Sequence, residues 1–171
     1  MKLLHNRFIL LWTVIVVLNI FASASLPTHD EPLIAVYTEN SGVVSPAGKR
    51  LYVVVSQEGV MTYVDRVGGR LTNRSRTLTR SELSQLTSLL EDSKLKTLIG
   101  PLRAPVFHPR DYQTSIQISI HRSTGDQKID LIDYDPSAGR DFPEAAKQVL
   151  CLLDGFTKSE YRVTQDCKLT W

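Results

Sequence analysis

The stretch LTRSELSQLTSLL, residues 78–90, holds the clearest secondary-structure signal in the chain. Thr79 and Glu82 stand three residues apart, which is the spacing of a capping box, where each side chain bonds the backbone N–H of the other. Apolar residues then recur at helical spacing with polar residues between them: Leu83, Leu86, Leu89 and Leu90. The pattern predicts an amphipathic helix that begins after Thr79 and packs its leucines on a core.

Two β-branched runs precede this helix. Residues 51–56 and 60–67 flank Gln57-Glu58-Gly59, and this arrangement predicts a β-hairpin. The second run ends at Gly68-Gly69. The polar, arginine-rich stretch from there to Thr77 is interpreted as an exposed connection.

A second set of elements follows the helix. Ile116, Ile118 and Ile120 alternate with polar residues, as in a strand with one buried face, and residues 128–134 are a suitable partner strand. A second helix is predicted from Asp141 to Gly155. Residues 96–111 contain three prolines and a glycine, which favours a long loop.

The order of strands, helix, strands and helix predicts an α+β fold, in which an antiparallel sheet of about four to five strands carries two helices on one face. Residues 25–50 are interpreted as an N-terminal lead-in with a short strand near residues 33–38, and residues 51–171 as a single domain. The length suits one domain with its own core.

The first 24 residues have the three parts of a secretory signal peptide. A basic start with Lys2 and Arg7 precedes an apolar run, and Ala22-Ser23-Ala24 supplies a cleavage site. The apolar run is short for a bilayer span, which needs about 20 residues. We therefore expect a secreted or periplasmic protein without a stable membrane span after cleavage; an uncleaved anchor is the alternative.

Two cysteines, Cys151 and Cys167, remain in the mature chain. An exported protein meets an oxidising compartment, so the sequence predicts a disulfide between them. Two unpaired thiols are the alternative interpretation.

Charge and composition argue against several classes of ligand. Removal of the leader leaves 18 basic and 18 acidic residues, so no global field attracts nucleic acid. Gly68-Gly69 lacks the further glycines and the lysine of a phosphate-binding loop. The sequence therefore predicts no cofactor and no nucleic-acid partner.

From about Leu51 to Phe156 the layout resembles small exported bacterial proteins that are known only as domains of unknown function. The resemblance rests on the hairpin ending near Tyr63, the capped helix, the Asp111-Tyr112 entry to the alternating strand and Pro143 before the last helix. It concerns architecture and implies no activity.

The strongest charge asymmetry is a set of arginines within fifteen residues that contain no acidic side chain: Arg66, Arg70, Arg74, Arg76 and Arg80. Guanidinium groups bind carboxylates, phosphates and sulfates bidentately, so an anionic polymer or an acidic protein surface is the expected partner. The alternative is a solvated loop whose charge aids solubility.

Asn73-Arg74-Ser75 also matches the N-glycosylation sequon, which matters only in a eukaryotic host.

Catalytic residue types are present without diagnostic spacing. The chain lacks the metalloprotease, calcium-loop and nucleophile-elbow motifs, and no metal site is predicted. We therefore expect a non-catalytic binding or accessory domain of the cell envelope or extracellular space. The rival hypothesis is a small hydrolase that uses His108 or His121 with nearby carboxylates, from the set Asp111, Asp130, Asp133, Asp135 and Asp141.

Overall fold

The computed structural model describes residues 32–42, 48–103, 112–134, 142–164 and 167, all of which belong to one compact unit, Glu31–Trp171. The predicted leader, residues 1–24, lies outside the described residues. Along the chain the elements are β1 (Pro32–Gly42), β2 (Gly48–Ser56), β3 (Val60–Val67), β4 (Arg70–Thr77), α2 (Arg80–Leu90), α3 (Ser93–Lys96), β5 (Gly100–Arg103), β6 (Tyr112–Arg122), β7 (Gly125–Ile132) and α4 (Glu144–Thr157).

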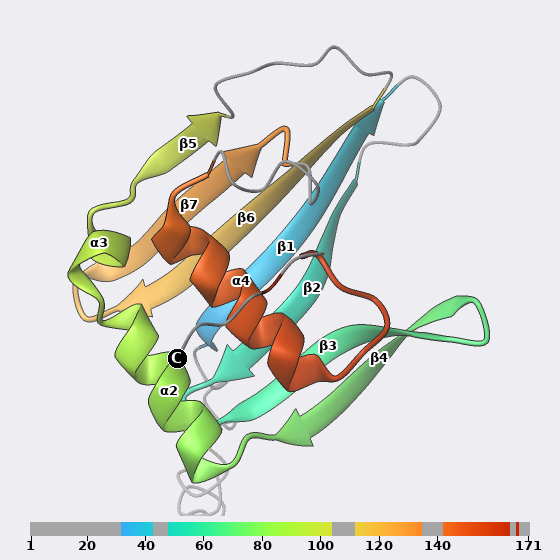
Figure 1. Cartoon of the computed structure of the whole chain (residues 1–171), viewed down its shortest axis with the longest axis horizontal. Helices are drawn as coiled ribbons and strands as arrows, with labels where there is room; N and C mark the ends of the chain where they lie inside the picture. Colours follow the sequence, from blue (N-terminus) through green and yellow to red (C-terminus); the bar gives the residue numbers. More distant parts are fainter. Residues whose placement is uncertain (1–31, 43–47, 104–111, 135–141, 165–166, 168–171) are drawn as a thin grey trace, which may run out of the picture. The chain divides into compact units, whose positions relative to one another are not determined.

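The strands form one sheet in the order β4-β3-β2-β1-β6-β7-β5 (Figure 1). Neighbouring strands are antiparallel except β5, which runs parallel to β7. The prediction of an antiparallel sheet with four to five strands and two helices is therefore wrong. The described chain forms a seven-stranded mixed sheet with three helices, although its α+β content agrees with the expected class.

Two strands account for the difference in number, β4 and β5. β1 includes the short strand expected near residues 33–38, but it spans Pro32–Gly42 and lies at the centre of the sheet. β4 occupies the stretch interpreted as a connection, and β5 includes Pro101 at a sheet edge, where a missing N–H is tolerated. β5 runs parallel to β7 because α2 and α3 carry the chain along one face before it returns to the sheet.

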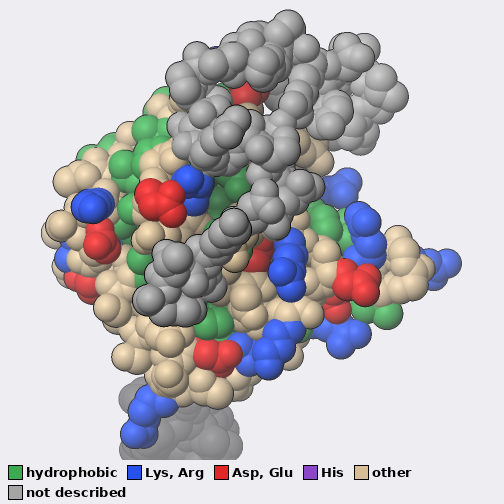
Figure 2. All heavy atoms as spheres, in the orientation of Figure 1, with side chains coloured by type: hydrophobic (Ala, Val, Ile, Leu, Met, Phe, Trp, Pro, Cys, Tyr) green, Lys and Arg blue, Asp and Glu red, His purple; other side chains and the backbone are tan. Residues whose placement is uncertain are grey.

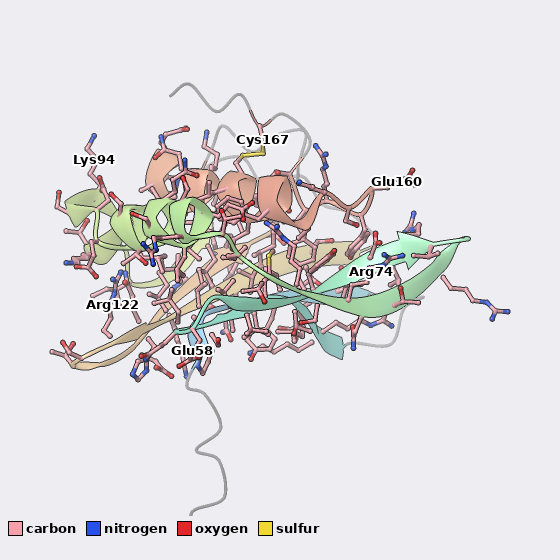
Figure 3. The ribbon with its side chains drawn as sticks, turned by 90° about the horizontal axis from the view of Figure 1, so that it is seen from below. Glu58, Arg74, Lys94, Arg122, Glu160 and Cys167 are labelled. Atoms are coloured by element: carbon pink, nitrogen blue, oxygen red, sulfur yellow. A yellow bond between two sulfur atoms is a disulfide. The ribbon has the colours of Figure 1, made fainter. Side chains whose placement is uncertain are left out.

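The core lies between the sheet and the helices, which cover one face only (Figure 3). Ile116, Ile118 and Ile120 of β6 are each at most 1% exposed, as the alternation predicts. Their neighbours on β1 include Ile34 and Val36, which are buried equally well. Because directly paired residues share a face, these two central strands present a continuous apolar surface to the helices.

Helix α2 confirms the opening motif. Thr79 is its N-cap, the Thr79 hydroxyl accepts from the Glu82 N–H, and a Glu82 carboxylate oxygen accepts from the Thr79 N–H at 2.8 Å. Leu86 and Leu90 are buried against the core. The local sequence thus sets both the start of the helix and the side that packs.

Helix α4 ends later than expected, since it passes Gly155 and ends at Thr157. Lys158 follows with a positive φ of 52°, a left-handed conformation that turns the chain back. Cys151 in this helix forms a disulfide with Cys167, with 5.3 Å between their Cα atoms, which confirms the predicted pair.

Strand β2 contains a bulge next to the residues that pair with β3. Val36 pairs with Val53 but Tyr37 pairs with Leu51, so Tyr52 is the extra residue. β2 and β3 pair over only three residues, Val53–Val55 with Met61–Tyr63, whereas β3 and β4 pair over eight. Residues 64–74, called the arm from here on, therefore continue past the region where β3 pairs with β2 (Figure 1).

Candidate functional site

The predicted arginines lie on secondary structure rather than on a loop. Arg66 is in β3, three others are in β4, and Arg80 is the first residue of α2. The stretch interpreted as a connection is thus the end strand of the sheet, and all but one of its eight residues are exposed. A strand fixes the spacing between its side chains, which a flexible loop does not.

The arginines divide into two groups. Arg76 is half-buried and its Nη2 donates to the Glu82 Oε1 at 2.6 Å, so it joins β4 to the capped end of α2. Arg80 lies at that same helix start. Arg66, Arg70 and Arg74 belong to the arm and are exposed. The structure therefore places three of the five predicted binding residues on the arm and gives Arg76 a structural role.

Arg70, Arg74 and Arg76 alternate along β4 and so share one face of the strand. Arg74 is paired with Tyr63 and Arg76 with Met61, two buried residues that face the helices. These arginines therefore point to the helix side of the sheet. Within the described residues, Arg70 makes no side-chain hydrogen bond or ion pair.

Asp65 is the acidic residue of the arm, and three groups bind it. It accepts hydrogen bonds from the Ser159 hydroxyl and from the Arg66 N–H, and its Oδ2 lies 3.0 Å from the Arg74 Nε. The Ser159 bond chiefly, then the Arg66 N–H and the Arg74 charge, hold the pKa of Asp65 below its usual value. Asp65 therefore remains ionised and keeps the Arg74 stem in place.

The chain after α4 lies beside the arm. This C-terminal segment, residues 158–164, contributes Ser159 to Asp65 and the ring of Tyr161, over which the Arg66 guanidinium lies 5.6 Å from the centroid. Exposed Lys158 and Arg162 add positive charge from the same segment. Figure 2 shows basic side chains gathered on the side of the molecule that carries the arm.

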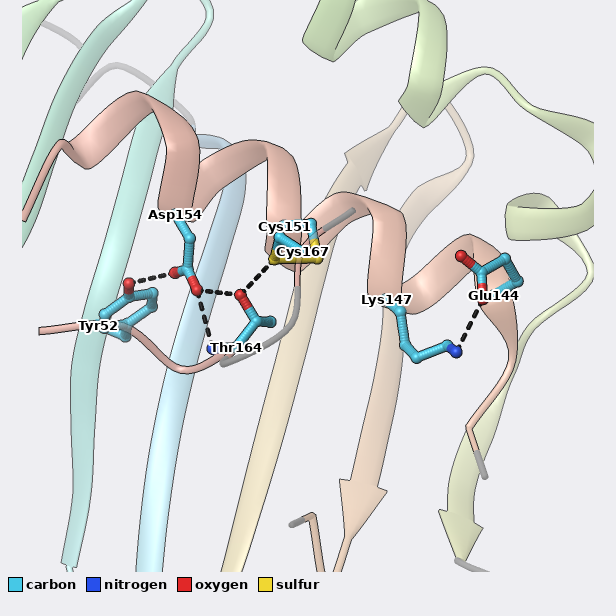
Figure 4. Close-up of a disulfide and its surroundings, with 7 residues drawn as sticks. All are labelled: Tyr52, Glu144, Lys147, Cys151, Asp154, Thr164 and Cys167. Atoms are coloured by element: carbon cyan, nitrogen blue, oxygen red, sulfur yellow. Dashed lines mark hydrogen bonds and ion pairs between the residues drawn. A yellow bond between two sulfur atoms is a disulfide. The ribbon is translucent and has the colours of Figure 1, made fainter. Parts of the chain in front are cut away.

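A buried polar cluster fixes this segment to α4 and β2 (Figure 4). Asp154 is 1% exposed, and its carboxylate accepts from the Tyr52 hydroxyl and from both the N–H and the hydroxyl of Thr164. Burial raises the pKa of Asp154 although these hydrogen bonds oppose it, and burial together with the Asp154 charge raises that of Tyr52. The β2 bulge explains how Tyr52 reaches α4, since it leaves both Tyr52 and Val53 buried.

The cluster acts as an anchor rather than as a reaction centre, because its polar groups satisfy one another away from solvent. Cys167 is bonded to Cys151 and its Sγ contacts the Thr164 hydroxyl, so the disulfide and the carboxylate hold the same stretch of chain. Neither Tyr52 nor Asp154 was singled out by sequence, because an acidic residue in an amphipathic helix normally indicates the wet face.

His121, the described histidine of the predicted catalytic set, lies near the C-terminal end of β6. Its Nδ1 is 3.1 Å from the Asp126 Oδ1, in a hollow of about 690 Å³ that also involves Glu91, Lys96 and Arg122. Glu91 binds both of those cations, and Lys128 also lines the hollow, so three cations there face the two carboxylates of Glu91 and Asp126.

The other predicted catalytic residues do not join His121. Asp130 accepts from the Gln117 side chain at 2.6 Å. Asp133 has a positive φ of 58° at the end of β7. The rest lie outside the described residues: His108, Asp111, Asp135 and Asp141.

The described residues contain neither a candidate metal site nor a helix that could span a membrane. No group of three or more histidine, cysteine, aspartate or glutamate side chains in this part of the chain has the arrangement of a metal site. None of the helices described is long and apolar enough to cross a bilayer.

No family model matches the chain, and no curated protein is significantly similar to it. Functional inference therefore rests on the geometry of the arm, the C-terminal segment and the hollow.

Proposed function

We propose that the protein is a non-catalytic binding module outside the cytoplasm, which holds an anionic polymer or an acidic protein surface through the arm. The observation that supports this function best is the exposure of Arg66, Arg70 and Arg74 on a two-stranded element next to Lys158 and Arg162. Only Asp65 and Glu160 offset these charges within the arm and the C-terminal segment. A multivalent anion binds with higher overall affinity when it contacts several cations at once.

The strand conformation favours recognition of a repeated charge. Residues of an extended strand rise about 3.4 Å each, so the Cα atoms of Arg70 and Arg74 are separated by roughly 14 Å. Guanidinium groups bind carboxylate and sulfate oxygens in pairs. A ligand with anionic groups along an extended chain therefore matches the arm better than a single small anion does.

The anchor explains how the arm is supported. Asp154 and the disulfide fix the C-terminal segment, and this segment presents Ser159 and Tyr161 to the arm. Binding residues on a supported element lose less conformational entropy when the ligand arrives. The anchor thus contributes to affinity without touching the ligand.

Residence outside the cytoplasm is supported by two features. The disulfide between Cys151 and Cys167 persists in oxidising compartments, and residues 1–24 have the pattern of a signal peptide. We therefore place the protein in the periplasm or the external medium. Mass spectrometry of the mature protein, with and without reductant, is expected to show a chain that begins at Ser25 and gains two hydrogen atoms on reduction.

The second candidate is hydrolysis at the hollow, and the contact between His121 and Asp126 favours it. A carboxylate on the imidazole Nδ1 orients the ring of a general base. The binding function is preferred because the arm has three arginines against one aspartate, whereas Lys96 and Arg122 of the hollow are both ion-paired with Glu91.

The test is affinity for sulfated dextran, with neutral dextran of equal length as the comparison. Arg66→Ser, Arg70→Ser and Arg74→Ser in one protein are expected to weaken binding at least tenfold, and added salt is expected to weaken wild-type binding. The matched control changes Lys94, Arg103 and Lys128 to Ser, which removes the same charge from exposed positions outside the arm. Equal losses in the two variants would reject the arm as the binding site.

A further inference from the structure

Strand β4 is the last strand of the sheet on its side, so one edge of its backbone has no neighbouring strand among those described. The pairing of β4 with β3 determines which backbone N–H and C=O groups of β4 point outward. Leu78 donates its N–H to the Gly59 carbonyl at 2.8 Å, which shows that residues two, four, six and eight positions before Leu78 also bond toward β3. The intervening residues therefore direct their N–H and C=O outward: Leu71, Asn73, Ser75 and Thr77.

This edge is unusually open to an added strand. β3 and β4 pair over eight residues without a register shift, so no bulge interrupts β4. It contains no proline, and seven of its eight residues are exposed. Proteins normally protect such an edge with prolines, bulges or charges, because its free backbone groups are a template for pairing.

Only charge protects β4, and the sign of that charge selects the partner. A second copy would have to pair antiparallel through the same outward residues. Each of the three central registers, with Asn73 opposite Leu71, Asn73 or Ser75, then places one arginine of β4 directly opposite another. Like charges directly opposite are destabilising, whereas opposite charges contribute favourably. An acidic strand has the complementary pattern.

We propose that the β4 edge binds an extended peptide segment with acidic side chains at alternate positions, by adding it to the sheet as a further strand. This inference rests on the proposed function and specifies its ligand. In antiparallel addition, the acidic residues lie opposite Arg70, Thr72, Arg74 and Arg76 on the helix side of the sheet. The residues between them bond to the outward backbone of Leu71, Asn73 and Ser75.

The apolar residues near the tip of the arm fit this arrangement. Leu71 is 44% exposed and lies on the sheet face that the helices leave open. It contacts whichever residue of the added strand stands opposite, so an apolar residue is favoured there.

Gly68 and Gly69 form the two-residue turn between β3 and β4, and both have positive φ. Such a turn twists the two strands in the sense that a sheet requires.

The experiment separates strand addition from charge attraction. The probe is a capped, fluorescein-labelled heptapeptide with glutamate at positions 1, 3, 5 and 7 and threonine between them. Two further probes carry N-methyl groups, either on the threonines or on the inner glutamates. In antiparallel addition only the threonine N–H groups bond to β4. Threonine methylation is therefore expected to weaken binding at least tenfold, and glutamate methylation much less, at equal charge.

The protein variant for the same test is Asn73→Pro. It removes one outward N–H, keeps every arginine and leaves the bonds between β3 and β4 intact, since proline is tolerated at a sheet edge. We expect weaker peptide binding with unchanged affinity for sulfated dextran. Asn73→Ala is the control, because it retains the N–H. If the proline alters the melting temperature, the methylated probes with wild-type protein decide the question.

Three other results would reject strand addition, the proposed function or both. Equal binding of the two methylated peptides overturns strand addition, while the arginine variant still tests the proposed function. Undiminished binding of the peptide and of sulfated dextran by the arginine variant rejects both proposals. Dimerisation of the free protein that Asn73→Pro abolishes would assign the edge to a second copy and overturn the inference.

Discussion

The centre of the sheet and the arm are both built from paired antiparallel strands, but they differ in what covers them. At the centre, Ile118 of β6 is fully buried beneath the helices. In the arm, Leu71 and Val67 are each 44% exposed. The comparison teaches that strand pairing and contacts with the C-terminal segment maintain the arm, whereas helix packing stabilises the centre. The arm is therefore the part whose side chains can serve a ligand at little cost in stability.

The largest expected effect comes from a matched pair of truncations across the two regions. Ile118→Ala leaves a cavity in the core and is expected to lower the free energy of unfolding by about 2–5 kcal/mol. Leu71→Ala is expected to change it by less than about 0.5 kcal/mol, because its site is open to solvent. Urea unfolding followed by circular dichroism measures both. Similar losses would show that the arm is part of the cooperative core.

The next effect tests whether the anchor supports the arm. Replacing Cys151 and Cys167 by serine opens a loop of 16 residues, and the free energy of unfolding is expected to fall by about 3 kcal/mol. Because the C-terminal segment also supports Asp65 and Arg66, affinity for sulfated dextran is expected to fall as well. Loss of stability with unchanged affinity would show that the disulfide supports the core alone.

The smallest effect concerns the Asp65 contact. The lowered pKa of Asp65 means that its contact with Ser159 stabilises the folded arm above the unfolded pKa, about 3.9, and is lost as the pH falls through the lower folded pKa. The NMR signal of Ser159 is therefore expected to stay constant from pH 7 to about pH 4 and to shift below that. Asp65→Asn should abolish the shift. A transition midpoint above pH 4 would contradict the assignment.

Local signals in the sequence predicted the parts of the fold that depend on neighbouring residues. The capping box of Thr79 and Glu82, the alternation of Ile116, Ile118 and Ile120, and the cysteine pair were each confirmed. The predicted first hairpin corresponds to β2 and β3. In each case the sequence pattern lies within the residues that form the structural feature, so the pattern alone predicts it.

The secondary-structure predictions were wrong where a segment has no apolar pattern or where tertiary contacts determine its structure. β4 has almost no apolar alternation because seven of its eight residues are exposed, so only Gly68-Gly69 could have indicated a two-residue hairpin turn. β5 is short and contains Pro101. Helix α4 continues through Gly155, because its packing against the core outweighs the low helix propensity of glycine.

The candidate site could be predicted in composition but not in arrangement. The sequence identified Arg66, Arg70 and Arg74, since clustered charge without acidic neighbours is visible in one dimension. It included Arg76, whose partner Glu82 becomes evident only when β4 meets α2. It missed the segment that carries Lys158 and Arg162, because that segment reaches the arm through the chain reversal after α4.

The most direct test of the account is a titration of the isotopically labelled protein with a sulfated dextran fragment, followed through its backbone amide NMR signals. We expect shifts confined to the arm, residues 64–74, and to the C-terminal segment, residues 158–164. Shifts centred on His121 and Asp126, with the arm unaffected, would contradict the account and favour the hollow as the functional site.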